Sequence, residues 1–139
     1  MTTAADVVTT ARSWIGTRWL HQGRAKGVGC DCAGLVIGVA RELGLADVNI
    51  ADYGRTPSRN QLIQRCSEHM QRVGAPAVGC VALMQFEREP QHLGIVGDYP
   101  GGGLSLIHAY AQQRRVVEHR LDGVWSGYVV AVFALPGVR

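Results

Sequence analysis

The sequence predicts an α+β fold, in which N-terminal helices pack on an antiparallel sheet of about five to six strands. The first half of the chain places apolar residues at helical spacing. After Pro76 the chain changes to short apolar segments separated by turn residues, which is typical of strands. A chain of 139 residues, 47% of them hydrophobic, can bury one core, so residues 1–139 are predicted to form a single domain.

Two helices are predicted from paired start and stop signals. Over residues 3–15, Thr2 or Thr3 can cap the start and Gly16 can end the helix. Over residues 31–43, Asp31 is placed as the N-cap and Gly44 follows the last turn. The apolar faces of these helices are formed by Ala4, Val7, Val8, Ala11 and Ile15 in the first, and by Leu35, Val36, Val39, Ala40 and Leu43 in the second.

A third helix and the strands follow. Pro57 and Ser58 mark the start of a helix over residues 58–70, whereas residues 16–30, with their glycines, are predicted to form an irregular loop. The segments after Pro76 that combine β-branched and aromatic residues are predicted strands. They are Val78–Phe86, His92–Gly97, Leu104–Ala109, Arg114–His119 and Gly127–Leu135.

Charge and hydropathy exclude several classes of protein. The net charge of +3 comes without a dense Lys/Arg run, which argues against nucleic-acid binding. No segment approaches the roughly 20 apolar residues of a membrane-spanning helix. Residues 1–6 lack the basic and apolar regions of a secretory signal, which predicts a protein that stays in the cytoplasm unless it leaves by another route, such as cell lysis or packaging in a phage-like particle. Its four cysteines are then predicted to be thiols, and the chain to be a monomer.

Cys32 is the candidate nucleophile. It opens the predicted helix over residues 31–43, where free backbone N–H groups and the helix dipole favour a thiolate. The same N–H groups can hold the oxyanion of a tetrahedral intermediate. A free cysteine is more commonly a small buried hydrophobe, so the position on the helix is what favours the functional interpretation.

His92 and His108 are the candidate base and its orienting partner. Each is a polar residue within an apolar predicted strand, and a Gly-rich turn joins the two strands. Such strands can lie side by side in a sheet and bring the two imidazoles together. A cysteine followed along the chain by a histidine and a third polar residue is the order of a papain-like cysteine peptidase. His92 would take the thiol proton and return it to the leaving amine.

Five residues flank the thiol and are predicted to line the substrate cleft: Trp19, His21, Asp31, Ala33 and Gly34. Ala33 and Gly34 keep the surroundings of the thiol small. Trp19 is either a packing residue or a wall of the cleft, and Asp31 is better placed as a helix cap than as a catalytic acid. Farther along the chain, His119 and His69 are predicted to be solvated, and Trp125 is assigned to the core or its rim.

A structural zinc site is the main rival interpretation. Cys30, Cys32, Cys66 and His69 supply four possible ligands, and the spacing from Cys66 to His69 suits zinc. The single residue between Cys30 and Cys32 is tighter than the usual two, which disfavours this site. Cys80 is predicted to be core. Thiol chemistry needs no cofactor or metal, and none is predicted.

The motifs resemble those of the NlpC-type cell-wall cysteine peptidases. Residues 29–36 (Gly-Cys-Asp-Cys-Ala-Gly-Leu-Val) resemble that family's Asp-Cys-Ser-Gly-Leu-Val signature. Residues 92–98 resemble its His-Val-Gly-Ile strand, residues 106–109 its third catalytic segment, and residues 11–17 the helix end before its Pro-Tyr. The form of residues 27–32 is similar to the branch encoded by phages and gene transfer agents. Arg18-Trp19 stands in place of the Pro-Tyr, Ala33 in place of the serine, and Cys80 in place of an aspartate.

The resemblance implies a papain-like NlpC-type domain that hydrolyses amide bonds in peptidoglycan stem peptides, with Cys32, His92 and His108 as catalytic residues. It also implies a place at a phage-like tail. Two alternatives stay open: a non-catalytic tail or assembly component of the same fold, and an amidase or acyltransferase that passes the same thioester to another acceptor.

Overall fold

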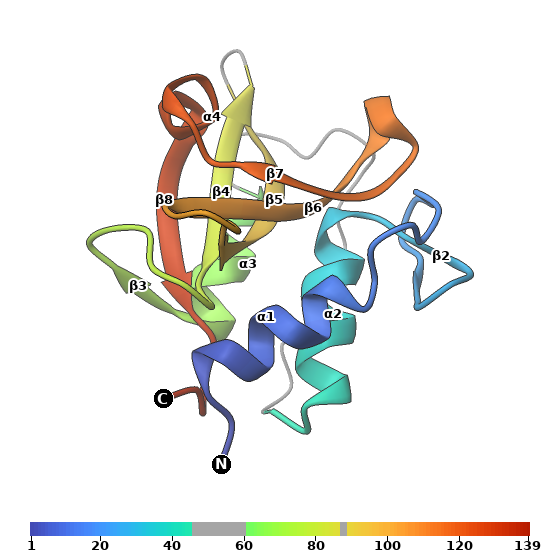
Figure 1. The fold of residues 1–139 in the computed structure, drawn as a ribbon, viewed down its shortest axis with the longest axis horizontal. Helices are drawn as coiled ribbons and strands as arrows, with labels where there is room; N and C mark the ends of the chain where they lie inside the picture. The colour runs from blue at the N-terminus through green and yellow to red at the C-terminus, as the bar shows by residue number, and fades with distance from the viewer. Residues whose placement is uncertain (46–60, 87–88) are drawn as a thin grey trace.

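The computed structural model describes residues 1–45, 61–86 and 89–139, and it confirms the predicted α+β class. Helices and an antiparallel sheet make up these segments, with the helices in the first part of the chain packed on one side of the sheet (Figure 1). The helices are α1 (Ala4–Arg12), α2 (Cys32–Glu42), α3 (Gln61–His69) and the short α4 (Gly123–Tyr128).

The main sheet has six strands in the order β3-β8-β4-β5-β6-β7, and each neighbouring pair is antiparallel. Consecutive strands from β4 to β7 are also neighbours in space, because short turns join them. The strands are β3 (Gln71–Val73), β4 (Val81–Phe86), β5 (Glu89–Asp98), β6 (Leu104–Tyr110), β7 (Arg115–Arg120) and β8 (Val129–Ala134). A second, two-stranded sheet joins β1 (Arg24–Ala25) to β2 (Gly29–Cys30).

Helix α1 begins at a capping box. The Thr3 hydroxyl accepts from the Asp6 N–H at 3.2 Å, and the Asp6 carboxylate accepts from the Thr3 N–H at 2.9 Å. The helix ends at Arg12, three residues before the predicted end at 15. Trp14 turns into the core at 2% exposure, whereas Ile15, which was assigned to the buried face, is 46% exposed because it lies beyond the helix.

Helix α2 follows the prediction closely. Asp31 is the N-cap, and Gly44 lies after the last turn at φ +68°. Every residue from 33 to 40 is buried, so this helix has no solvated face along most of its length. It packs against α1 and covers β5 and β6 (Figure 1).

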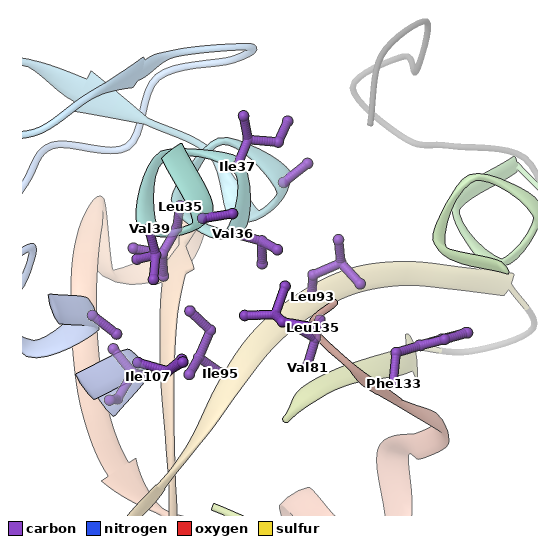
Figure 2. Packing of buried hydrophobic residues seen from close by; sticks show 14 of the residues in the cluster. Leu35, Val36, Ile37, Val39, Val81, Leu93, Ile95, Ile107, Phe133 and Leu135 are labelled. Carbon is purple, nitrogen blue, oxygen red and sulfur yellow. The ribbon is translucent and has the colours of Figure 1, made fainter. Parts of the chain in front are cut away.

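The main core lies between α2 and the sheet. Figure 2 shows Leu35, Val36 and Val39 of α2 on the side of the helix that faces the strands, whereas Ile37 points away from them. The apolar contacts between α2 and the strands hold the start of α2 against β5, at the end of the sheet where the candidate residues lie. The core side chains drawn there with labels are Leu35, Val36, Ile37, Val39, Val81, Leu93, Ile95, Ile107, Phe133 and Leu135.

The opposite face of the sheet carries a smaller apolar cluster. Strand residues that alternate with those of the main core form it, and Trp125 of α4 packs on them. The buried strand residues of this cluster are Ala82, Met84, Val96 and Leu106. His92 and His108 have the same parity along β5 and β6 as Val96 and Leu106, so alternation places them on this face.

Several elements differ from their predicted bounds. Residues 16–30, predicted as a loop, contain β1 and β2; β3 and α4 were not predicted. Gly79 adopts φ +87° and delays the start of β4 to Val81, which leaves half-buried Cys80 outside the strand to which it was assigned. The predicted start of the third helix, at 58, lies outside the described residues.

Candidate active site

Cys32 is the first residue of α2, as predicted. The loop before it is fixed by Asp31, whose carboxylate accepts from the N–H of Gly34 at 2.8 Å and from the N–H of Gln22 at 2.6 Å. Both oxygens of this buried carboxylate are therefore used to hold backbone groups, which confirms Asp31 as a helix cap and adds a second role in fixing the 20–23 loop.

The Cys32 thiol lies against β5, at the residue that follows His92. The ladder between β5 and β6 runs from Asp98 only as far as Ile95, which pairs with Ile107. Beyond that point the N–H of Leu93 is directed at the Cys32 sulfur. The candidate nucleophile thus lies beside the strand residue that follows the candidate base. Within the part of the chain that the structure describes, no hydrogen bond joins the thiol to the His92 ring.

His92 and His108 lie together, as the hairpin argument predicted. Strands β5 and β6 are antiparallel neighbours, and His92 Nε2 lies 2.5 Å from His108 Nδ1. Their ring centroids are 4.8 Å apart at an edge-to-face angle of 73°. Both rings are buried, at 7% and 0% exposure, so this bond is shielded from water.

His119 extends this pair, although it was predicted to be solvated. It is half-buried on β7, and its Nε2 lies 2.8 Å from Nε2 of His108. Its Nδ1 lies 3.0 Å from the carbonyl oxygen of Arg120. The register of β7 on β6 brings it there: His119 pairs with Leu106, whose side chain shares a face with that of His108, and no signal within the segment itself points to this pairing.

Aromatic side chains enclose the histidines. Tyr110 stacks on His108 with centroids 5.1 Å apart, and Trp125 lies edge-on to the same ring at 5.2 Å. Phe86 lies 5.5 Å from His92. Since these rings replace water around the imidazoles, they make the charged forms costly.

Burial keeps both candidate imidazoles neutral near pH 7. It lowers the pKa of His92 to about 3, with a smaller contribution from His119. It lowers the pKa of His108 to about 2, and the neighbouring His92 and His119 add to the effect. A neutral imidazole keeps one lone pair, which a general base requires.

The expected thiolate is not favoured at Cys32. Burial raises the pKa of this thiol to about 12, and the negative charge of Asp31 adds to the rise. The N–H groups of Leu93, Ala33 and Cys32 itself lower it, but by less. The N–H groups at the helix start favour the thiolate, as expected from the sequence, but in the resting protein desolvation outweighs them. Activation of the thiol by the neighbouring imidazole stays a prediction.

The other predicted cleft residues lie around the loop that precedes the thiol. His21 is half-buried, with Nδ1 3.9 Å from the Asp31 carboxylate. Ala33 is fully buried. Gly34 is buried against the loop, since a Cβ there would lie 1.8 Å from the carbonyl oxygen of Gly23. Gly34 thus allows the loop to pack closely on the start of α2, and a direct contact of Ala33 or Gly34 with substrate stays a prediction.

Trp19 lines a cavity of about 360 Å³ together with Arg18, Ala111 and Arg114. Its N–H donates to the Arg114 carbonyl at 2.9 Å, and its backbone bridges to Cys30. The cavity therefore lies between the segment that leads to the thiol and the turn that follows the His108 strand. Among the described residues, the guanidinium groups of Arg18 and Arg114 form no ion pair, so both can meet an anion.

The rival zinc site finds no support in the described residues, which contain no group of three or more His, Cys, Asp or Glu side chains that could hold a metal ion. Cys30 and Cys66 are buried thiols, and burial raises the pKa of each to about 12. No described helix is long and apolar enough to cross a membrane.

Comparison with solved structures identifies the fold. The NlpC/p60 domain of the peptidoglycan hydrolase SagA superposes with a TM-score of 0.69 over 96% of this chain and 100% of that one, at 18% identity. The chain has the NlpC/p60 fold. NlpC2 from Trichomonas vaginalis matches with a TM-score of 0.68 and 15% identity over 98% of this chain. An NlpC/P60 family protein from Bacillus cereus matches at 0.66 and 17% over 94%.

The chain spans all of the SagA domain but only 48% of NlpC2 and 39% of the Bacillus cereus protein. It therefore corresponds to one part of those longer chains. Neither a protein-family model nor a curated protein sequence matches it significantly.

Proposed function

We propose that this chain is a thiol-dependent hydrolase of amide bonds in peptidoglycan stem peptides. The observation that carries the proposal is the bonded pair of His92 and His108 beside a cysteine at the start of a helix. The fold shared with a peptidoglycan hydrolase domain supports the substrate class.

The neutral thiol and the neutral imidazole define how the reaction begins. His92 accepts the Cys32 proton while the sulfur attacks the amide carbonyl, so no thiolate has to exist beforehand. The backbone N–H of Cys32 donates to the developing oxyanion. His92 then gives its proton to the leaving amine, which leaves a thioester. In the second half of the reaction, His92 takes a proton from water while the hydroxide attacks the thioester. His92 then returns this proton to the departing sulfur, which restores the thiol and releases the new carboxyl group of the peptide.

The cavity at Trp19 suits a peptide that carries carboxylates. Arg18 and Arg114 provide positive charge to a cavity that the indole of Trp19 also lines. A guanidinium group binds a carboxylate through paired N–H donors, and the indole can pack against aliphatic parts of the peptide. Stem peptides combine these features, which supports them as substrates over neutral peptides.

The experiment that tests the proposal compares three proteins on purified stem peptide: wild type, Cys32→Ala, and Cys80→Ala as a matched control. We expect Cys32→Ala to lose hydrolysis while keeping its melting temperature, because alanine suits the first turn of a helix. Cys80 is half-buried outside the site, so its variant should keep the activity. Hydrolysis by Cys32→Ala, measured by mass spectrometry of the products, would refute the mechanism.

One observation favours a second function, that of a non-catalytic component with the same fold. The Cys32 pKa is raised to about 12, which a purely structural thiol would share. This alternative predicts that the wild-type protein binds stem peptide without cleaving it. The amidase or acyltransferase alternative predicts new amide products when a free amine is added to the reaction.

The proposal extends to a place at a phage-like tail. Its support is the form of residues 27–32 in the sequence. Mass spectrometry of particles purified from induced cells tests it directly: the chain should co-purify with tail proteins, and its absence from particles would reject the association.

A further inference from the structure

The histidine pair ends in a third histidine and then in a backbone carbonyl, and that ending fixes the direction of every bond. His92 contacts His108, His108 contacts His119, and His119 contacts the carbonyl oxygen of Arg120. A carbonyl oxygen can only accept a hydrogen bond. Nδ1 of His119 must therefore carry the hydrogen of the last bond.

The remaining hydrogens follow by elimination. A neutral imidazole has one donor nitrogen and one acceptor nitrogen. When His119 is in its neutral form and donates from Nδ1, its Nε2 accepts from Nε2–H of His108. Nδ1 of His108 then accepts from Nε2–H of His92. We call His92, His108 and His119, joined by these hydrogen bonds, the histidine relay. Its only free lone pair is on Nδ1 of His92, the nitrogen that contacts neither His108 nor His119.

We propose that His119 is a positioning residue, which sets the tautomers of His108 and His92 and thereby leaves Nδ1 of His92 as the base. This inference rests on the proposed function and names a residue that acts through two others. His119 itself need not touch the substrate, because its Nε2 is already occupied by His108.

The rings around His108 make its tautomer sensitive to the loss of a hydrogen-bond partner. The aromatic rings of Tyr110 and Trp125 close the space around His108, which is fully buried. Trp125 also lies 4.6 Å from the His119 ring. In such a site His108 has no water to replace a lost partner, so removing the acceptor of its Nε2–H would force the ring to change tautomer or turn. Either change reaches His92 through a single hydrogen bond.

Nitrogen NMR tests the tautomers without any substrate. The sample is the full chain with Cys32→Ala, labelled with ¹⁵N in its histidine rings and held at pH 7.5. We expect the Nε2–H form for His92 and His108 and the Nδ1–H form for His119. An Nε2–H form at His119, or an Nδ1–H form at His92, would overturn the proposal whether or not the wild-type protein hydrolyses peptides.

Two substitutions at His119 provide the kinetic test. In His119→Gln the amide oxygen can reach the position of Nε2 and accept from His108, whereas His119→Phe keeps a ring against Trp125 but has no acceptor. We expect His119→Phe to lower kcat by about 10–100-fold with KM unchanged, which is the size of effect known for residues that orient the ligands of catalytic metals. His119→Gln should restore most of that loss, and His69→Gln on α3 serves as the control histidine.

The outcomes separate the two ideas. A wild-type protein without activity would reject the proposed function, while the tautomers would still decide the relay. Equal kcat values for wild type and a folded His119→Phe would reject the relay and leave the hydrolase intact. If His119→Phe and His119→Gln lose kcat equally at unchanged melting temperature, His119 does not act as an acceptor, and the proposal is also rejected.

Discussion

The two halves of the candidate active site are held in different ways. On the imidazole side, hydrogen bonds between side chains run from His92 through β6 to a backbone carbonyl on β7. On the thiol side, Cys32 is surrounded by backbone N–H groups and by the cap residue Asp31. Burial makes both halves neutral, but only on the imidazole side does a terminal carbonyl acceptor set the direction of the hydrogen bonds. In the proposed mechanism, the thiol depends on that direction to lose its proton.

The largest expected effect comes from breaking the imidazole side at its end. His92→Ala removes the base, and we expect kcat to fall by about 10²–10⁴-fold, the usual contribution of general base catalysis. His69→Ala, a half-buried histidine on α3 outside the site, is the control and should leave kcat unchanged. Steady-state hydrolysis of stem peptide measures both, and a His92→Ala rate close to wild type would show that another group accepts the thiol proton.

The neutral state of the imidazole side also predicts acid sensitivity of the fold. Below about pH 6.5 the unfolded chain binds a proton at each of His92 and His108, whereas the folded chain, with pKa values of about 3 and about 2, does not. Falling pH therefore favours unfolding. Between pH 7.5 and 5.5 the two rings together should remove about 3 kcal/mol of stability.

Urea unfolding at several pH values measures this loss. The double variant His92→Gln/His108→Gln should show a flatter profile between pH 7.5 and 5.5. Glu118 does not confound this pH range. Burial raises the pKa of Glu118, but hydrogen bonds from Arg12 and Ser105 outweigh burial and lower it. The stability that Glu118 contributes is therefore lost only below about pH 4.5, where carboxylates of unfolded chains protonate. A wild-type profile that is flat down to pH 5 would show that the rings are accessible to protons.

The same contrast explains what the sequence could predict. Cys32, Asp31 and Gly44 belong to one helix, and local signals fixed its ends almost to the residue. The pairing of His92 with His108 followed from strands joined by a short turn. His119 was missed because its role depends on the register between β6 and β7, which its own segment does not encode. The raised pKa of the Cys32 thiol could not be predicted, because desolvation arises from packing between segments far apart in the chain.

The short elements that were missed have similar causes. Helix α4 begins where Asp122 accepts from the N–H groups of Val124 and Trp125, but two glycines in six residues give it little helical propensity of its own. Strand β3 gains its structure from pairing with β8 rather than from its polar sequence. In both cases the tertiary contacts outweigh the local preference.

A substitution of the helix cap Asp31 tests what sets the pKa of the Cys32 thiol. Asp31→Asn removes the negative charge beside Cys32, so we expect the pKa of the thiol to fall and iodoacetamide to modify it faster at pH 8. It also leaves one buried N–H, of Gly34 or Gln22, without a good acceptor, which should cost about 1–3 kcal/mol of stability. Asp6→Asn, in the capping box of α1, is the control. Unchanged Cys32 alkylation in folded Asp31→Asn would show that the charge of Asp31 does not contribute to this pKa.

The smallest expected effect concerns the cavity at Trp19, which Arg18 and Arg114 also line. Arg18→Ala should raise KM for a stem peptide with free carboxylates by about 2–5-fold, because an exposed ion pair contributes roughly 0.5–1 kcal/mol. The same substitution should leave KM unchanged for the peptide whose carboxylates are amidated, since that peptide offers no anion. Arg41→Ala, an exposed arginine at the far end of α2, controls for general charge. An equal rise in KM for both peptides would mean that Arg18 shapes the cavity without binding a carboxylate.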